Sequence, residues 1–600
     1  MERKDIDKKY KWDLSVIYES VDAFNEDFAA VEKRIKDFKR HEKLMTGSGK
    51  ALYEALDEIT SIENNLMLLW EYASLNFSTD STSTQNQALS ARVRSLANVM
   101  GEASWFVSPK ILTLDEKILA EFKAECPELA RFDRMIFKIM RGKPYTLSDE
   151  SEALLSKIED SFGSHSRIRS MFTTADLHFG KIKDGEGKTV ELTDTNYVNF
   201  LLSKDRAVRQ RAFRTLYKTY EQFGNTFASL YESRIKEAVV QAKVRGFKNS
   251  ITASTFSDEV TPSIYNNLIK TVRGGLKPLY DYYEIKRQML GVDKLHLYDV
   301  YTPLLGELNV EYTYEQAVEE VLKTTEIYGK EYHDALKAGL TEKGWVDVYP
   351  SHGKRGGAFS SGCHGTEPYI LTNFNGHYND VSTLAHEAGH SMHTWFSNKY
   401  NEAHNANYTI FVAEVASTVN ELLLAHRKLR ECESDDEKLY ILNQLMETYK
   451  GTIYRQTMFA EFERDMHALC EKGEPLTAEK MNKCYYKLVK KYFGPDVAVD
   501  KQIAYEWMRI PHFFSCFYVY KYSTCICAAA AIVKRIEEEG EGYINQYIDF
   551  LKCGGSKSPL ESLLVAGIDM NSPEVIQNGI DEFASVVEQF KTILNSKSCK

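Results

Sequence analysis

The 600-residue sequence lacks the features of membrane, secreted and nucleic-acid-binding proteins. Its longest apolar run, Cys525 to Val533, has nine residues and is too short to cross a bilayer. The first ten residues, 1–10, are charged and contain no apolar stretch of the kind found in signal peptides. No basic and aromatic cluster is present, and the net charge is −11. We therefore expect neither a membrane nor a nucleic acid as a partner.

The sequence also lacks a disulfide or thiol-redox pattern. Its ten cysteines are scattered and form no Cys-x-x-Cys motif; Cys525 and Cys527 form only a Cys-x-Cys. Reduced thiols are the expected state, and this favours a cytoplasmic location. We find neither an internal repeat nor a low-complexity tract.

What the sequence does have is a helical hydrophobic period over most of its length, with 43% hydrophobic residues to fill a large core. Amphipathic runs are predicted near 20–41, 49–77, 84–106, 147–161, 205–244, 262–290, 437–469 and 478–493. Strand-type residues occur only within about 345–374, in three short segments between glycine and proline breaks. The glycine- and charge-rich stretch 180–188 is interpreted as a turn and a break in the chain. The fold class is therefore mainly α with one small sheet.

The segment Ala385 to Thr394 contains the motif His-Glu-x-x-His. On a helix, His386 and His390 lie one turn apart on the same face, so both imidazoles can bind one zinc ion. Glu387 can then act as the general base on a water at the metal. The competing interpretation is a surface helix with two solvated histidines. Gly389 speaks against it, because a glycine inside a helix costs about 1 kcal/mol and needs a reason, such as the close approach of another segment.

A catalytic zinc needs a third protein ligand. The next helical stretch, 409–424, follows a polar loop, and an antiparallel helical hairpin centred on residue 402 would bring Glu414 level with His390. Glu421 lies two turns further, about 10 Å along the same helix face, and is expected to support a ligand instead. Glu402 is the third option, an exposed acid in the loop.

Several segments together resemble the oligoendopeptidase F branch of the thimet-type oligopeptidases. They are His386–His393 (H-E-A-G-H-S-M-H), Phe411–Glu421 (F-V-A-E-V-A-S-T-V-N-E), 353–360, 368–376 and 510–523. The resemblance implies two helical lobes that enclose a deep substrate channel, with a small β-sheet next to the zinc-binding helix. It implies an N-terminal helical lobe at 1–195, a catalytic domain at 196–600, one zinc ion per chain and Glu414 as the third ligand.

Two further groups of residues are candidates for the substrate site. Gly356, Gly357, Ala358 and Phe359 precede the zinc helix, and a sheet edge there could bind an extended peptide through its backbone. A plain hairpin turn is the alternative. The resemblance also places a histidine and a tyrosine where they stabilise the oxyanion, which match His512 and Tyr520.

The choice of tyrosine stays open among Tyr518, Tyr520 and Tyr522, and a tyrosine-rich core helix is the alternative to any such role. The hypothesis is therefore a zinc endopeptidase that hydrolyses short unstructured peptides, with Glu387, His512 and Tyr520 as catalytic residues. Two alternatives are a zinc carboxypeptidase of similar fold and a non-catalytic peptide-binding protein. The oligomeric state is not predicted.

Overall fold

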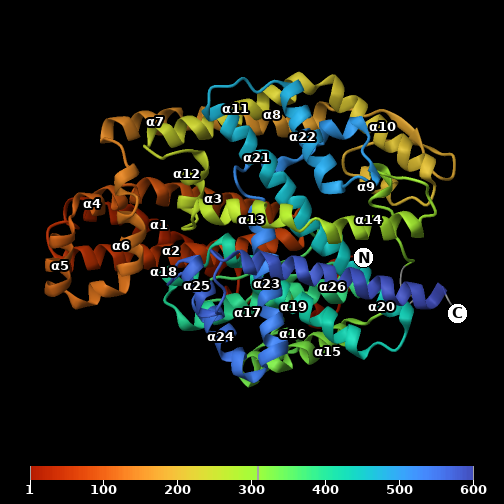
Figure 1. Cartoon of the computed structure of the whole chain (residues 1–600). Coiled ribbons are helices and arrows are strands. Elements are labelled where there is room, and N and C mark those ends of the chain that lie inside the picture. Colours follow the sequence, from red (N-terminus) through yellow and green to blue (C-terminus); the bar gives the residue numbers. More distant parts are fainter. Residues whose placement is uncertain (1, 307–309, 599–600) are drawn as a thin grey trace. The chain divides into compact units, whose positions relative to one another are not determined.

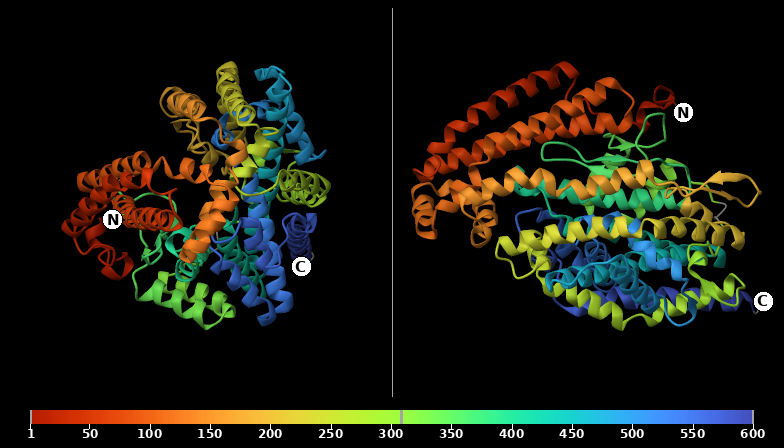
Figure 2. Two further views of the ribbon diagram at one scale, coloured as in Figure 1. Left: turned by 90° about the vertical axis from the view of Figure 1, so that its left-hand side faces the viewer. Right: turned by 90° about the horizontal axis from the view of Figure 1, so that it is seen from above.

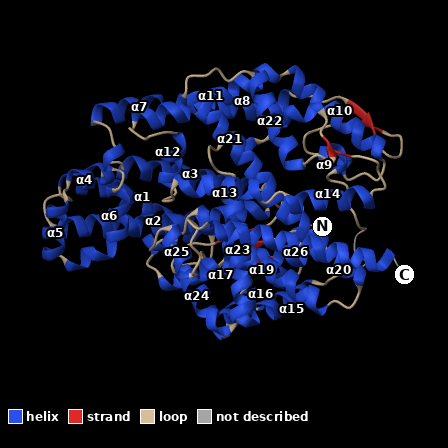
Figure 3. Cartoon of the chain, in the orientation of Figure 1, coloured by secondary structure: helices blue, strands red, loops and turns tan. Residues whose placement is uncertain are grey.

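Helices make up most of the protein. The structure is a computed structural model that describes residues 2–306 and 310–598. Figure 3 shows helices throughout these ranges, with a few short strands between them. The predicted mainly α fold class is confirmed. Within the described ranges, no helix is both long and apolar enough to cross a membrane.

The chain divides into two compact units, each built from three separate segments. Unit 1 comprises Met1–Pro144, Asn309–Arg427 and Ile532–Ile568, and unit 2 comprises Tyr145–Leu308, Lys428–Ala531 and Asp569–Lys600. The expected boundary at 195/196 lies inside the first segment of unit 2. The two compact units of the structure therefore differ from the expected N-terminal lobe at 1–195 and catalytic domain at 196–600. The expected substrate channel between two lobes stays a prediction.

Unit 1 begins with three long helices that run side by side, drawn red to orange in Figures 1 and 2. They are α1 (Val21–Phe38), α2 (Gly49–Thr79) and α3 (Thr84–Ser104). Each starts at a serine whose side chain accepts a hydrogen bond from a backbone N–H three residues later, which satisfies a donor that the helix leaves unpaired. Their apolar faces form one core with residues such as Val31, Ile59 and Val93. These helices confirm the amphipathic runs predicted there.

The described part of unit 1 also contains ten shorter or later helices and a small sheet. They are α4 (Val107–Thr113), α5 (Glu116–Glu125), α6 (Asp133–Met140), α15 (Tyr314–Thr325), α16 (Lys330–Thr341), α17 (Tyr378–Tyr400), α18 (Ala403–Ala406), α19 (Ile410–Glu431), α24 (Glu541–Lys552) and α25 (Pro559–Val565). Two of the five boundaries between the units fall inside α19 and inside α23 (Tyr520–Glu539).

The sheet of unit 1 has the order β4 (Val346–Asp347), β6 (Tyr369–Leu371), β5 (Phe359–Ser361). The central strand β6 is fully buried and pairs parallel with β4 and antiparallel with β5. Strand β5 is an edge strand, and both β5 and β6 pack against α17. The predicted sheet next to the His-Glu-x-x-His helix is therefore confirmed, with shorter strands than expected.

Unit 2 is also helical. Its helices are α7 (Asp149–Phe162), α8 (Ser164–Met171), α9 (Tyr197–Leu201), α10 (Arg206–Gln222), α11 (Gly224–Val244), α12 (Ser250–Ser257), α13 (Pro262–Gly274), α14 (Lys277–Met289), α20 (Asp435–Tyr449), α21 (Gln456–Glu471), α22 (Ala478–Phe493) and α26 (Pro573–Ser598). α20 and α26 run side by side (Figure 1). The single run predicted at 437–469 is two helices joined by a π-helical segment, Lys450–Arg455.

Unit 2 also corrects the expectation that extended structure is confined to 345–374. Strand β1 (Lys181–Lys183) pairs antiparallel with β2 (Thr189–Glu191), and β3 (Leu295–His296) pairs parallel with β7 (Val497–Ala498). The stretch predicted as a turn is thus a small hairpin. Ile182 is buried between two exposed lysines, which is the alternation of inward and outward side chains expected in a strand. The strand has only three residues, so this alternation is too short to be recognised in the sequence.

Candidate metal and active site

Helix α17 carries the His-Glu-x-x-His motif, and Asp380 fixes its N-terminus. The Asp380 carboxylate accepts hydrogen bonds from the backbone N–H of His377 at 2.9 Å and of Asn375 at 3.1 Å. The N-cap residue is His377. Asp380 instead occupies the first turn, where its negative charge is favourable.

Gly389 lies where the backbone of α19 crosses α17. A Cβ at this position would lie 2.5 Å from the carbonyl oxygen of Ala416 and 2.6 Å from the Cα of Ser417. The prediction that a neighbouring segment comes close at this glycine is confirmed. The buried Asn420 holds the same contact, because its amide donates to the carbonyl of Ala385 at 3.3 Å.

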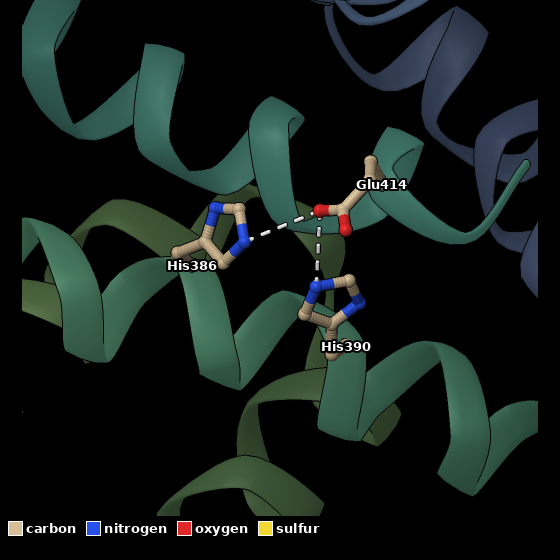
Figure 4. A group of neighbouring side chains, drawn as sticks. All are labelled: His386, His390 and Glu414. Carbon is tan, nitrogen blue, oxygen red and sulfur yellow. Dashed lines mark ion pairs between the residues drawn. The ribbon is translucent and has the colours of Figure 1, made fainter. Parts of the chain in front are cut away.

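The close approach of the two helices brings three potential metal ligands together (Figure 4). The Oε2 atom of Glu414 lies 3.3 Å from Nε2 of His386 and 3.2 Å from Nε2 of His390. The two imidazole rings are 4.9 Å apart between centroids. The structure therefore places the three residues predicted as metal ligands in one cluster, as the helical-hairpin argument expected for Glu414.

The two other acids considered as the third ligand, Glu421 and Glu402, are not part of this cluster. Oε2 of Glu421 is 3.2 Å from Nδ1 of His386, on the side of the ring that faces away from Glu414. Glu421 can therefore orient this imidazole, which is the usual position of an acid that supports a metal-binding histidine. Glu402 instead pairs with Arg131 at 2.9 Å in an exposed position and does not reach the histidines.

The charges of the cluster favour a cation. Burial by itself lowers the pKa of His386, but hydrogen bonds with Glu414 and Glu421 outweigh burial and raise this pKa to about 10. Burial by itself raises the pKa of the Glu414 carboxyl. Its contacts with both imidazoles outweigh burial and lower this pKa to well below its usual range. A positive charge is thus strongly stabilised at this point, whether it is carried by protons or by a metal ion.

Glu387 lies on the buried side of α17. Burial raises the pKa of its carboxyl, and the nearby imidazoles and the backbone amide of Ser360 on strand β5 partly oppose this. Its Oε2 atom is buried and has no hydrogen-bond partner among the described residues. A carboxylate with a raised pKa and an unused oxygen has the properties of a general base.

The segment 356–359 leads into the edge strand β5. Gly357 adopts a φ of +82°, which favours glycine, and a Cβ added at Gly356 or Gly357 would meet no atom of the described residues within 4 Å. Asn373 holds the turn by donating to the carbonyls of Arg355 and Gly357 at 3.0 and 2.8 Å. The substrate-binding role of this segment stays a prediction.

The two predicted oxyanion donors, His512 and Tyr520, both belong to unit 2. His512 is exposed, and its ring centroid lies 6.0 Å from those of Tyr518 and Tyr522. Tyr520 has no exposed surface, and its hydroxyl lies 3.4 Å from Asp258. This burial favours the alternative of a core tyrosine for Tyr520, and the assignment of the oxyanion donor stays a prediction.

The sequence analysis missed a second group of possible metal ligands in unit 2, formed by Glu463, His467 and Cys516. The signal available in the sequence was a Glu and a His four residues apart on a predicted helix. The third member comes from a distant segment, and nothing in the sequence pattern connects it to the other two.

The fold and the first cluster together define a mainly α protein with the donor set of a one-metal site, two imidazoles and one carboxylate. The family model described as peptidase family M3 matches residues 199–582, and that described as oligopeptidase F matches 110–179. The chain belongs to peptidase family M3, and it is a peptidase. The family named from the sequence motifs is confirmed.

Similar proteins extend over almost the whole chain. Oligopeptidase PepF of Bacillus subtilis is 39% identical over 99% of this chain and 88% of its own length. A crystal structure of a Chlamydophila abortus protein matches with a TM-score of 0.92 at 33% identity and covers 99% of both chains. That of oligoendopeptidase-F from Enterococcus faecium matches with a TM-score of 0.75 at 32% identity, over 96% of this chain and 99% of its own.

Proposed function

We propose that this peptidase is a zinc-dependent endopeptidase that hydrolyses short, unstructured oligopeptides. The observation that carries the proposal is the cluster of His386, His390 and Glu414 beside Glu387. One ion per chain is expected in this cluster. The relatives named oligopeptidase and oligoendopeptidase support the substrate class.

The residues present fit a zinc ion. Both histidines direct Nε2 at one oxygen of Glu414, and this arrangement of two nitrogens and one oxygen is typical of a catalytic zinc site, which leaves one position for substrate or water. Glu421 holds the opposite nitrogen of His386 and so fixes the tautomer that presents Nε2. When bound, zinc polarises the scissile carbonyl and increases the acidity of water.

The residues of the chain supply the proton transfers. The Glu387 carboxylate accepts a proton from the attacking water, and the same carboxyl then delivers it to the amine that leaves when the peptide bond breaks. The edge strand β5 lies next to Glu387 and has an unpaired side in the sheet of unit 1. We propose that an extended peptide pairs with this strand, and that Gly356, Gly357, Ala358 and Phe359 line its path.

The role of oxyanion donors for His512 and a tyrosine is proposed from the resemblance. Among the three tyrosines, we propose Tyr518 or Tyr522, because both are partly exposed and lie beside His512, whereas Tyr520 is buried. A hydroxyl directed at the developing negative charge lowers the barrier of acyl transfer. A cytoplasmic location is proposed because the nine described cysteines form no disulfide bond among the described residues.

The proposal is tested with a mixed peptide library and its end-blocked counterpart. We expect cleavage at internal bonds of both, loss of activity with a chelator and recovery with zinc. Cleavage of the free C-terminal residue alone would instead establish a carboxypeptidase. Binding of peptides without cleavage in the zinc-loaded protein would establish a peptide-binding protein.

A further inference from the structure

Unit 2 contains a buried cluster that shares no residue with the proposed zinc site of unit 1. Glu463 and His467 lie one turn apart on α21, and Cys516 lies in the segment between His512 and α23. One donor atom from each of the three residues lies within 4.8 Å of the other two. The exposed fractions of Glu463 and His467 are 1% and 2%. Ionisable side chains are rarely buried to this degree without partners.

His467 is held in the tautomer that binds metals. The hydroxyl of Ser250 donates to the carboxylate of Glu471 at 2.7 Å, so its oxygen is left to accept a hydrogen bond from Nδ1 of His467 at 2.9 Å. Nδ1 therefore carries the proton, and Nε2 carries a lone pair. Nε2 is buried and has no hydrogen-bond partner in the described part of the chain. A chain of hydrogen bonds from a carboxylate to the far nitrogen is the arrangement that orients metal-binding histidines.

Glu463 has one oxygen in use and one that is not. Its Oε1 accepts the backbone N–H of Phe517 at 2.7 Å, whereas the buried Oε2 has no partner within residues 2–306 and 310–598. Phe517 has a φ of +57°, a strained value for a residue that is not glycine. The carboxylate thus holds a strained turn, and its second oxygen belongs to the same cluster as the lone pair of His467.

Oε2 of Glu463 and Nε2 of His467 are two buried hydrogen-bond acceptors without a donor among the described residues, which costs free energy. A cation bound between them would remove this cost. Cys516 adds a sulfur ligand from the residue next to Phe517. It lines a cavity of about 350 Å³, together with Arg234 and Ser250, which gives an ion a route of entry and gives a water molecule room. The guanidinium of Arg234 lies 3.4 Å from Glu237, so its charge is opposed locally.

We propose that Glu463, His467 and Cys516 form a second zinc site. One carboxylate, one neutral imidazole and one thiolate balance the charge of Zn²⁺, and a nitrogen, oxygen and sulfur set is suited to this metal. The thiol loses its proton when the ion binds, and a water from the cavity takes the fourth position. The ion joins α21 to the segment that carries Phe517 and Tyr518, so its role is structural.

The alternative occupant of the cluster is a proton. Burial raises the pKa of Glu463 to about 8, and it raises that of Cys516 to about 12, so both are neutral in the metal-free protein at pH 7. The proton on Glu463 would then satisfy the buried acceptors in place of a metal ion. The two occupants differ in a measurable quantity, which is the number of metal ions that the folded chain retains.

The first test is metal counting on tag-free, full-length protein that has been saturated with zinc and then desalted. We expect two zinc ions per chain in the wild type, and one in Cys516→Ser and in His467→Gln. Cys470→Ser is the matched control, because Cys470 lies on α21 outside the cluster, and it should retain two. Circular dichroism shows whether each variant is folded.

The second test replaces zinc with cobalt. A bond between Co²⁺ and a thiolate gives a near-ultraviolet charge-transfer band, and the cluster of His386, His390 and Glu414 contains no sulfur. The band should appear in the wild type and in His390→Ala, and disappear in Cys516→Ser. Failure of the catalytic proposal would thus leave this result intact. One zinc per folded wild-type chain, or a cobalt protein without the band, would overturn the second site and leave a protonated Glu463.

Discussion

Substituting Gly389 by alanine tests whether the contact between α17 and α19 sets the metal site. Alanine is the better helix former by about 1 kcal/mol, so a contact-free position would gain stability from this change. At Gly389, however, the new Cβ would lie 2.5 Å from the carbonyl oxygen of Ala416, which is backbone and cannot turn aside. α19 must move back by about 1 Å to restore an ordinary contact of about 3.4 Å.

The expected magnitude follows from this movement. Overpacking of this kind costs about 1–3 kcal/mol, which offsets the gain in helix propensity and leaves the variant less stable. Glu414 lies on the same helix two residues before Ala416, so its oxygen moves away from both imidazoles by a similar distance. Metal sites tolerate about 0.2 Å in ligand distance. We therefore expect zinc affinity to fall by at least about 10–100-fold, the size of effect seen when ligand positioning is lost.

The assay is competition for zinc against a chelator of known affinity, with thermal unfolding of the metal-free protein in parallel. Gly101→Ala is the matched control, because Gly101 lies in α3 of the same unit and a Cβ there meets nothing within 4 Å. This control should bind zinc normally and unfold at the same or a higher temperature. If Gly389→Ala behaved like Gly101→Ala in both measurements, the contact would not position the site.

Three further outcomes are expected. Glu387→Gln should retain zinc by metal analysis but lower kcat by several orders of magnitude, and a loss of zinc would make Glu387 a ligand instead of a base. Glu414→Ala should be purified without zinc, whereas Glu421→Ala should retain it with about 10–100-fold weaker affinity; the reverse order would exchange their roles. Tyr518→Phe or Tyr522→Phe should lower kcat by about 10²–10³-fold, whereas Tyr520→Phe should change mainly stability, and a wild-type kcat in both Tyr518→Phe and Tyr522→Phe would exclude these two tyrosines as donors.

The parts of the fold that follow from local patterns were predictable. Helix α22 occupies the predicted 478–493, and it ends before Gly494, whose φ of +80° stops the helix. The metal cluster was predictable for the same reason. Its histidines are neighbours on one helix, and Glu414 follows on α19 after a short connection that contains only the four-residue helix α18, so helix geometry determines which side chains meet.

The parts that depend on distant or irregular contacts were not predictable. Strands β3 and β7 pair over two residues each and lie about 200 positions apart in the sequence. Two residues are too few to show the alternation of buried and exposed side chains that predicts a strand. The burial of Tyr520 was not predictable either, because Phe517, with its φ of +57°, turns the chain just before α23. A non-glycine residue in this conformation has no sequence signature, so the side chains that follow could not be assigned to the surface or the core.

The interleaving of the two units has a consequence for synthesis. Unit 1 needs residues as far apart as its first segment, Met1–Pro144, and its last, Ile532–Ile568. A ribosome that adds about 5–20 residues per second delivers these segments roughly 20–80 seconds apart. During that interval the apolar faces of α1, α2 and α3 can pack on one another and the strands of the sheet are made, but α24 and α25, which complete the unit, are not yet made. Co-translational chaperones are therefore expected to bind the nascent chain, and truncation near its C-terminus should damage a unit that begins at its N-terminus.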